Sequence, residues 1–413
     1  MEFVSNSNTQ TLKNSNNLYV HFPFCRSKCS YCALYSRAGV SRAERDAYVR
    51  RLAREIGSLG EIESLGSLGE IGSLGEIGSL GEIGSLGALG EIESLGSLGS
   101  IGEIGERGER GLDANTARTD PNQTLIGPKL KTIYFGGGSP ALCDLSVLAP
   151  ALRPLCGEGT EFTVELHPLD VTEAKLAELK ALGVTRISMG VQSLDDATLA
   201  DMGRGYTVDE AERAFALVKK HFDNAGIDLI VGYPGDEVKV KGEGEQWNLQ
   251  RLESWGLKHC SVYALQNERG LRNVPDDDAV LDRIKAVAAV LKGMGLERYE
   301  ISNYAVPGFE CRHNLAVWRG EDYIGLGDGA YGRIGLMRTK FGKEEVVSAE
   351  FDEKERRLFR LRTKEGLDAS GHPEWEAPLR TACQEGLLTQ SGSVYRLTER
   401  GMEVCDSILA ELV

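Results

Sequence analysis

Residues 18–32 read LYVHFPFCRSKCSYC, a short apolar strand followed by a loop that carries Cys25, Cys29 and Cys32. The spacing C-x3-C-x2-C brings three thiols into one loop, whereas the usual iron–sulfur sites use four. Three thiolates would leave one iron without a protein ligand, so that iron could bind an exchangeable group. We therefore interpret the loop as a site for an iron–sulfur cluster with one open iron.

Two other chemistries use similar cysteine patterns. The pair Cys29 and Cys32 has the spacing of a thioredoxin-type redox motif, and the three cysteines with His21 have the ligand types of a structural zinc site. Neither alternative accounts for a third cysteine in a loop this rich in aromatic residues. The spacing alone favours a cluster and leaves both alternatives open.

The composition limits the class of protein. The chain has 413 residues, 41% of them hydrophobic, which suffices for one large domain with an appendage or for two domains. No apolar run approaches a membrane span, and the polar N-terminus lacks the apolar core of a signal peptide. Nine cysteines, three of them clustered, fit a reducing compartment, and a net charge of −15 argues against nucleic acid as a partner. We expect a cytoplasmic protein with at most peripheral membrane contact.

A repetitive tract interrupts the first third of the chain. From Gly57 to Gly111 the sequence repeats Gly-Ser-Leu and Gly-Glu-Ile units, and its ten glutamates and two arginines account for eight of the fifteen net negative charges. Glycine at every third position makes ordering costly, and the tract lacks the proline of collagen. The tract follows a helix predicted from a capping box at Ser41–Glu44 and ending near Ile56. We interpret it as a repeat expansion within an insert at 57–128 that lengthens a helix-to-strand connection.

Strand and helix patterns alternate through the rest of the first 305 residues. This alternation predicts an α/β fold with a parallel sheet, a partial (β/α)6 barrel of the TIM type. The predicted strands are LYVHF (18–22), TIYF (132–135), FTVEL (162–166), RISM (186–189), IDLIV (227–231) and CSVYAL (260–265).

Chemically distinctive residues follow or end most of these strands. Because the carboxyl ends of parallel strands meet at one edge of a sheet, we expect these residues to lie together. They are the glycine turn 136–140, Glu165 with His167, Gln192, Asp228 and Tyr263 with Ala264.

These motifs resemble the radical S-adenosylmethionine (SAM) superfamily, and within it the group that contains oxygen-independent coproporphyrinogen III dehydrogenase and the heme chaperone HemW. The resemblance spans residues 18–56 and 131 to the C-terminus. The stretches that carry it are LYVHFPFCRSKCSYC, IYFGGGSP, RISMGVQSLDD, IDLIVGYPG, RYEISNYA and CRHNLAVW.

The resemblance implies a radical SAM barrel with a [4Fe–4S] cluster on Cys25, Cys29 and Cys32, whose open iron is chelated by SAM. Two positions depart from the family pattern, with His167 in place of asparagine and Ser139 in place of threonine. The SAM contacts implied by the resemblance are Tyr19, Tyr31, Gly137, Gly138, Ser139, Glu165, Gln192, Arg204, Asp228 and Ala264.

The resemblance also leaves a choice of function between a porphyrinogen-decarboxylating enzyme and a heme carrier. The dehydrogenases have a further cysteine where this chain has Leu34, which favours the carrier. The CRHNLAVW stretch resembles a heme-binding motif, with Val317 in place of tyrosine, and it makes His313 and Cys311 the candidate heme ligands. The implied partners are heme or porphyrinogen, heme-accepting proteins such as respiratory enzymes, and an electron donor, and a homodimer remains open.

The remaining residues are assigned by pattern. We predict a polar tail at 1–17, a barrel at 18–305 and a C-terminal HemW/HemN-like domain at 306–413. From 379 onwards the sequence reads as a helix, a hairpin around Ser391–Ser393 and a final helix, a winged-helix-like α+β module. The mixed charge of the module argues against DNA binding, and we expect it to pack over the barrel mouth.

Overall fold

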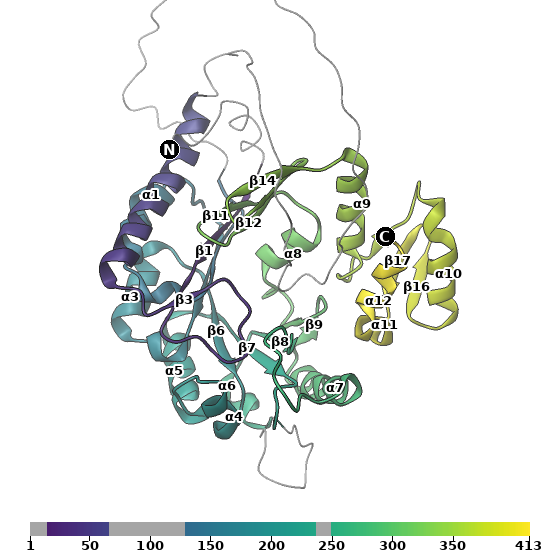
Figure 1. Cartoon of the computed structure of the whole chain (residues 1–413), viewed down its shortest axis with the longest axis horizontal. Helices are drawn as coiled ribbons and strands as arrows, with labels where there is room; N and C mark the ends of the chain where they lie inside the picture. Colours follow the sequence, from purple (N-terminus) through teal and green to yellow (C-terminus); the bar gives the residue numbers. More distant parts are fainter. Residues whose placement is uncertain (1–14, 66–128, 237–248) are drawn as a thin grey trace, which may run out of the picture.

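A computed structural model describes residues 15–65, 129–236 and 249–413. They form one nine-stranded sheet with helices packed along it, and a smaller α+β unit near the C-terminus (Figure 1). The strand order is β11-β1-β4-β5-β6-β7-β8-β10-β9. The strands are β1 Asn17–Phe22, β4 Thr132–Gly137, β5 Glu161–Leu166, β6 Arg186–Gln192, β7 Asn224–Val231, β8 His259–Ala264, β9 Glu297–Arg298, β10 Asn303–Ala305 and β11 Ile324–Leu326.

Seven neighbouring strands, from β11 to β8, run parallel. Beyond β8, β10 pairs antiparallel with β8, and β9 pairs antiparallel with β10. The sheet is open, with β11 and β9 at its edges. All six predicted strands are present, so the α/β fold with a partial barrel is confirmed. The strands β9, β10 and β11 carried no clear sequence signal because each has only two or three residues.

The helices cover mainly the outer face of the sheet. Figure 1 shows α1, α3 and α5 along one side of the sheet and α8 on the other. The helices are α1 Arg42–Leu65, α2 Ala149–Leu152, α3 Glu173–Leu182, α4 Asp196–Asp201, α5 Val208–His221, α6 Arg251–Trp255, α7 Asp277–Gly293, α8 Arg312–Trp318, α9 Ala349–Arg360, α10 Glu376–Gln384, α11 Glu399–Glu403 and α12 Cys405–Ala410.

The helix α1 begins as predicted and ends later than predicted. The Ser41 hydroxyl accepts from the Glu44 amide, and the Glu44 carboxylate accepts from the Ser41 amide, which is a capping box. The helix continues past Ile56 to Leu65, so it takes up the first repeat units of the insert. Leu59 packs against the main core, and this packing outweighs the low helix propensity of the glycines. The rest of the insert, 66–128, lies outside the described residues.

The two faces of the sheet differ in chemistry because side chains alternate along each strand. On β1, Leu18, Val20 and Phe22 are fully buried in the apolar core beneath the helices. Tyr19 and His21 point to the opposite, concave face, where polar residues from the other strands also lie. We call the carboxyl ends of β1 and β4–β8 the rim of this concave face and their amino ends the floor.

The helix α8 lies at the floor, and β11 beyond it joins the main sheet beside β1. A three-stranded sheet follows, with β12 Tyr331–Ile334, β13 Met337–Lys340 and β14 Lys343–Val346. A separate core starts at Leu358 and runs through the C-terminal unit. The predicted domain boundary at 306 stays a prediction. The segment 312–334 packs with the barrel core rather than with this second core.

The C-terminal unit has the predicted element order. It contains α10, the strands β15 Leu367–Asp368, β16 Leu388–Ser391 and β17 Val394–Leu397, and a final helical segment divided at Val404 into α11 and α12. Its ion pairs reach α7, through Lys285–Glu403, and its polar contacts reach α9. These contacts lie at the β8–β10–β9 side of the sheet, and within the described part of the chain none joins the unit to the cysteine loop.

In the described residues, no helix is both long enough and apolar enough to cross a membrane.

Candidate functional site

The cysteine loop leaves the rim at the end of β1. Cys29 is buried, Cys25 and Cys32 are half-buried, and all three are free thiols. Burial raises the pKa of the Cys25 and Cys32 thiols, and the neighbouring thiols raise it further, while Arg204 lowers it. Three sulfurs thus share one small region beside one cation.

This donor set fits an iron–sulfur cluster. Within the described ranges no group of three or more His, Cys, Asp or Glu side chains is placed to hold a single metal ion. A cubane cluster is bound differently, because each cysteine bonds to a separate iron and the sulfurs lie further apart than around one ion. The raised pKa values of Cys25 and Cys32 mean that these thiols are costly to ionise on their own. The positive iron ions of a bound cluster would favour the thiolates, and the buried Arg204 would offset the remaining negative charge.

The glycine turn holds the cysteine loop by backbone hydrogen bonds. The Gly138 amide donates to the Phe22 carbonyl at 2.7 Å, and the Ser139 amide donates to the Phe24 carbonyl at 2.6 Å. A Cβ at Gly138 would lie 2.4 Å from the Phe24 carbonyl oxygen, and one at Gly137 would lie 2.4 Å from the His21 ring. These glycines are required by the close approach of the protein's own strands.

Asp170, which was not predicted, connects this turn to the cysteine loop. Its buried carboxylate accepts a hydrogen bond from the Ser139 hydroxyl and a 2.6 Å hydrogen bond from Nε of Arg26, which lies between Cys25 and Cys29. The only sequence signal was an acidic residue shortly after Glu165 at the end of a strand. Asp170 therefore orients Ser139, one of the predicted SAM contacts, and holds the cysteine loop through Arg26.

The end of β6 carries a backbone outlier. Gln192 has φ of +73°, and the pairing of β6 with β7 shifts register between Gly190 and Gln192, which marks a β-bulge. Left-handed backbone is unfavourable for a residue with a side chain, and such strain and bulges concentrate at functional sites. The bulge places the predicted SAM contact Gln192 at the rim in a conformation that a regular strand would not allow.

Arg204 is buried next to this bulge. Its guanidinium donates to the Gly190 carbonyl at 2.8 Å, to the Tyr206 hydroxyl at 3.0 Å and to the Cys29 sulfur at 3.3 Å. A weaker contact reaches the Tyr31 hydroxyl at 3.4 Å. The arginine thus joins the β6 bulge to the cysteine loop, and two predicted SAM contacts, Tyr31 and Arg204, lie together.

Glu165 and Asp228 form an acidic pair on the concave face. Glu165 accepts from the Tyr134 hydroxyl at 2.8 Å and from the Gly137 amide at 3.0 Å, and Asp228 accepts from the Ser188 hydroxyl at 3.0 Å. Burial, followed by repulsion from Asp228, raises the pKa of Glu165 to about 7. Burial likewise raises the pKa of Asp228. A hydrogen-bond donor or a cation on a bound ligand would therefore stabilise the ionised form of both carboxyl groups.

Two other predicted contacts lie at the margins of this face. The Tyr19 hydroxyl is 3.0 Å from Nδ1 of His21, whose Nε2 is 2.9 Å from the Tyr35 carbonyl oxygen, so His21 braces the cysteine loop. Ala264 is exposed at the end of β8, where it pairs with Val231.

The candidate heme ligands lie apart from this rim. His313 and Cys311 belong to the start of α8 at the floor, and both side chains are buried. The Nδ1 atom of His313 is 2.8 Å from the Thr132 hydroxyl, and burial lowers the pKa of the imidazole to about 3. The Glu161 carboxylate accepts from the amides of Arg312 and His313 and so caps the helix. Nδ1 of His313 and the thiol of Cys311 are therefore both occupied by contacts inside the protein.

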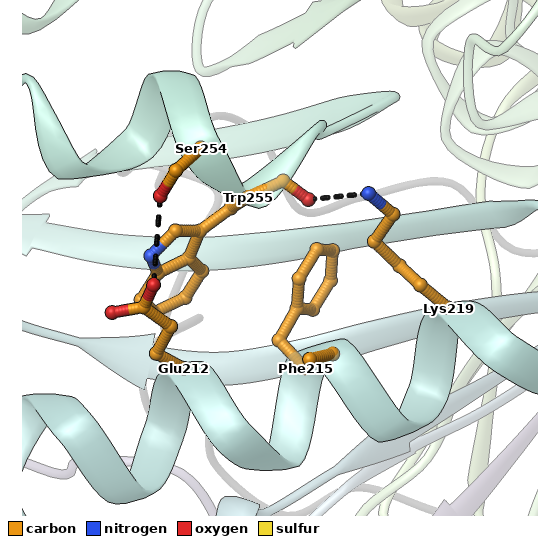
Figure 2. Close-up of a pocket in the computed structure, with 6 residues that line it drawn as sticks. Glu212, Phe215, Lys219, Ser254 and Trp255 are labelled. Atoms are coloured by element: carbon orange, nitrogen blue, oxygen red, sulfur yellow. Dashed lines mark hydrogen bonds between the residues drawn. The ribbon is translucent and has the colours of Figure 1, made fainter.

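A surface cavity lies away from both regions. Figure 2 shows this cavity, of about 160 Å³, between α5 and α6 on the outer side of the barrel, with Phe215 and Trp255 in its wall. Lys219 closes one side by donating to the Trp255 carbonyl at 2.7 Å (Figure 2). None of the predicted site residues lines it.

Comparison with known proteins identifies the family of the chain. Residues 123–239 match the Radical SAM superfamily. The heme chaperone HemW of Lactococcus lactis is 33% identical over 270 residues, which cover 58% of this chain and 70% of that protein. The heme chaperone HemW of Escherichia coli is 27% identical over 95% of this chain and 96% of its own length.

A solved structure shares the fold. Coproporphyrinogen III oxidase (HemN) from Escherichia coli, described as a radical SAM enzyme, superposes with a TM-score of 0.71 at 17% identity, covering 99% of this chain and 93% of that protein. At this level of identity the similarity concerns the fold alone.

Proposed function

The chain belongs to the HemW family of radical SAM proteins, and on that premise we propose that it is a heme chaperone that holds a [4Fe–4S] cluster and SAM and passes heme to acceptor proteins. The observation that carries the proposal is the convergence of three free cysteines, Arg204 and the strained Gln192 at one rim. The proposal places the protein in the cytoplasm, with an electron donor and heme-accepting proteins such as respiratory enzymes as partners.

Cys25, Cys29 and Cys32 would hold the cluster. The bound cluster would supply electrons to the sulfonium of SAM, and this chemistry belongs to the cofactor. The protein orients the cysteine loop through Asp170 and the glycine turn. A cation beside the cysteines also offsets the negative charge that three thiolates bring.

The remaining rim residues would bind SAM by complementary polarity. Arg204 can pair with the carboxylate of the methionine moiety. Because the amides of Gly138 and Ser139 already donate within the protein, the turn offers carbonyl oxygens to the ammonium group. Glu165 and Asp228 can accept from ribose hydroxyls or from the ammonium group. Tyr19, Tyr31, Gln192 and Ala264 would complete the site.

Heme is the proposed cargo, and its iron ligand stays a prediction. His313 is a suitable ligand type, since neutral imidazole binds iron, and its lowered pKa keeps the ring neutral at physiological pH. Its burial at the floor means that ligation would have to be coupled to a displacement of α8. Cys311, whose pKa is raised to about 12 by burial, is a poorer thiolate donor.

One pair of assays separates the carrier from the alternative, a coproporphyrinogen III dehydrogenase. The anaerobically reconstituted protein is titrated with hemin, as wild type and as His313→Ala, and is assayed for decarboxylation of coproporphyrinogen III. Saturable hemin binding without decarboxylated product is the expected result. Product formation would overturn the carrier function.

A further inference from the structure

Arg204 is a buried cation without a carboxylate partner. It is only 9% exposed, and in the described part of the chain no carboxylate lies within ion-pair distance of its guanidinium. An arginine stays charged at any pH at which a protein is folded, and an unpaired charge in the interior is strongly destabilising. An anion bound beside Arg204 would remove this cost.

The guanidinium of Arg204 is held in one orientation by its neutral partners. Its bonds to the Gly190 carbonyl and the Tyr206 hydroxyl fix the plane of the group, and Tyr206 itself donates to the Val191 carbonyl at 2.8 Å. The edge that remains faces the Cys29 sulfur at 3.3 Å. The bond between Arg204 and Cys29 is therefore set by the bulge at the end of β6.

The turn that carries Arg204 is joined to the cysteine loop by the backbone as well. Gly203 and Gly205, on either side of Arg204, have φ of +75° and +73°, a left-handed conformation that glycine adopts without strain. The Ser30 amide, next to Cys29 in the loop, donates to the Met202 carbonyl at 3.4 Å. The close approach of the guanidinium to the sulfur therefore does not depend on the two side chains alone.

Arg204 treats the three sulfurs unequally. It donates a hydrogen bond to Cys29, whereas it acts on Cys25 and Cys32 only as a nearby charge. Hydrogen bonds to the sulfurs and the charge around a cluster are among the properties that set its reduction potential. An added electron makes a cluster more negative, so a buried cation that donates to a ligand sulfur stabilises the reduced form more than the oxidised form.

We propose that Arg204 is a positioning residue that raises the reduction potential of the cluster through its hydrogen bond to the Cys29 sulfur, before SAM binds. The inference rests on the cluster of the proposed function, and it assigns Arg204 a role that is separate from pairing with SAM. The bond makes the cluster easier to reduce by an electron donor of a given potential. Loss of the guanidinium makes the cluster harder to reduce.

The test is a potentiometric titration of the anaerobically reconstituted protein without SAM, followed by the electron paramagnetic resonance signal of the reduced cluster. In Arg204→Gln we expect the ratio of reduced to oxidised cluster at the wild-type midpoint potential to fall about tenfold, which for one electron is a shift of about 59 mV. Arg204→Lys keeps the charge and should show a smaller shift. Lys28→Gln is the matched control, because it removes an exposed positive charge from the same loop and leaves the contact of Arg204 with Cys29 in place.

Iron and sulfide contents show which variants hold a full cluster. If Arg204→Gln does not, Tyr206→Phe takes its place, because it removes the hydroxyl that holds Nε of Arg204 and should lower the potential by less. A potential equal to that of the wild type, or a drop no larger than in Lys28→Gln, would overturn the role of Arg204.

A hemin titration of the same proteins separates this inference from the proposed function. Normal hemin binding with unchanged potentials would overturn the role of Arg204 alone. A wild type that shows the expected potentials and binds no hemin would overturn the heme function alone.

Discussion

The rim and the floor of the concave face contain the same kinds of side chain and use them differently. At the rim, Cys29 lies in the cysteine loop and His21 braces that loop, while Gln192 is held in strained backbone. At the floor, Cys311 and His313 are buried, and Glu161 accepts hydrogen bonds from both ends of that short segment. Residue type therefore does not distinguish a binding site from a structural cluster in this protein. Backbone strain and unused bonding capacity do.

The largest expected effect concerns the floor. Replacing Glu161 with alanine removes the acceptor for the first amides of α8 and leaves them buried without a partner. We expect the free energy of unfolding to fall by about 3 kcal/mol in urea denaturation. The control is Glu158→Ala, an exposed glutamate in the preceding turn. A loss below about 1 kcal/mol would show that the floor is not primarily structural.

The acidic pair provides an intermediate effect with a defined pH dependence. Glu165 has an ordinary pKa of 4.5 and a raised pKa of about 7 in the folded protein, so the folded state retains a proton that the unfolded state has lost. Stability should therefore fall as pH rises from about 4.5 to 7, and Glu165→Gln should not show this loss. We expect the variant to become more stable than the wild type by about 2 kcal/mol at pH 8, measured by urea denaturation. Parallel pH profiles would refute the raised pKa.

The smallest expected effect concerns the strained rim. Gln192→Gly relieves the left-handed backbone, so the free energy of unfolding should change by less than about 1 kcal/mol. The affinity of the reconstituted protein for SAM, measured by calorimetry, should fall about tenfold because one polar contact is lost. The control is Asn273→Gly, another residue with positive φ, in the segment between β8 and α7. Equal SAM affinity in wild type and Gln192→Gly would mean that the strain serves the fold.

The sequence predicted the strands of the barrel well because each combines β-branched residues with a marked end. The prediction that α1 ends near Ile56 was wrong, since tertiary packing of Leu59 extends the helix into the glycine repeat. The sequence could not place Cys311 and His313 at the floor, because their motif does not indicate how deeply a residue is buried or at which end of the sheet it lies. Asp170 was missed for a similar reason, since its two partners are distant in sequence.

The parallel pairing of β1 with β11 has a consequence for biosynthesis. Leu18 pairs with Ile324, and the hydroxyl of Tyr48 on α1 joins the His21 carbonyl to the Asp328 amide. A chain that emerges from the ribosome N-terminus first must therefore wait for about three hundred further residues before its first strand gains this neighbour. Until then the Tyr35 ring cannot pack against Gly329, so the cysteine loop lacks one of the contacts that hold it in the folded protein. We expect metal delivery to follow translation rather than accompany it.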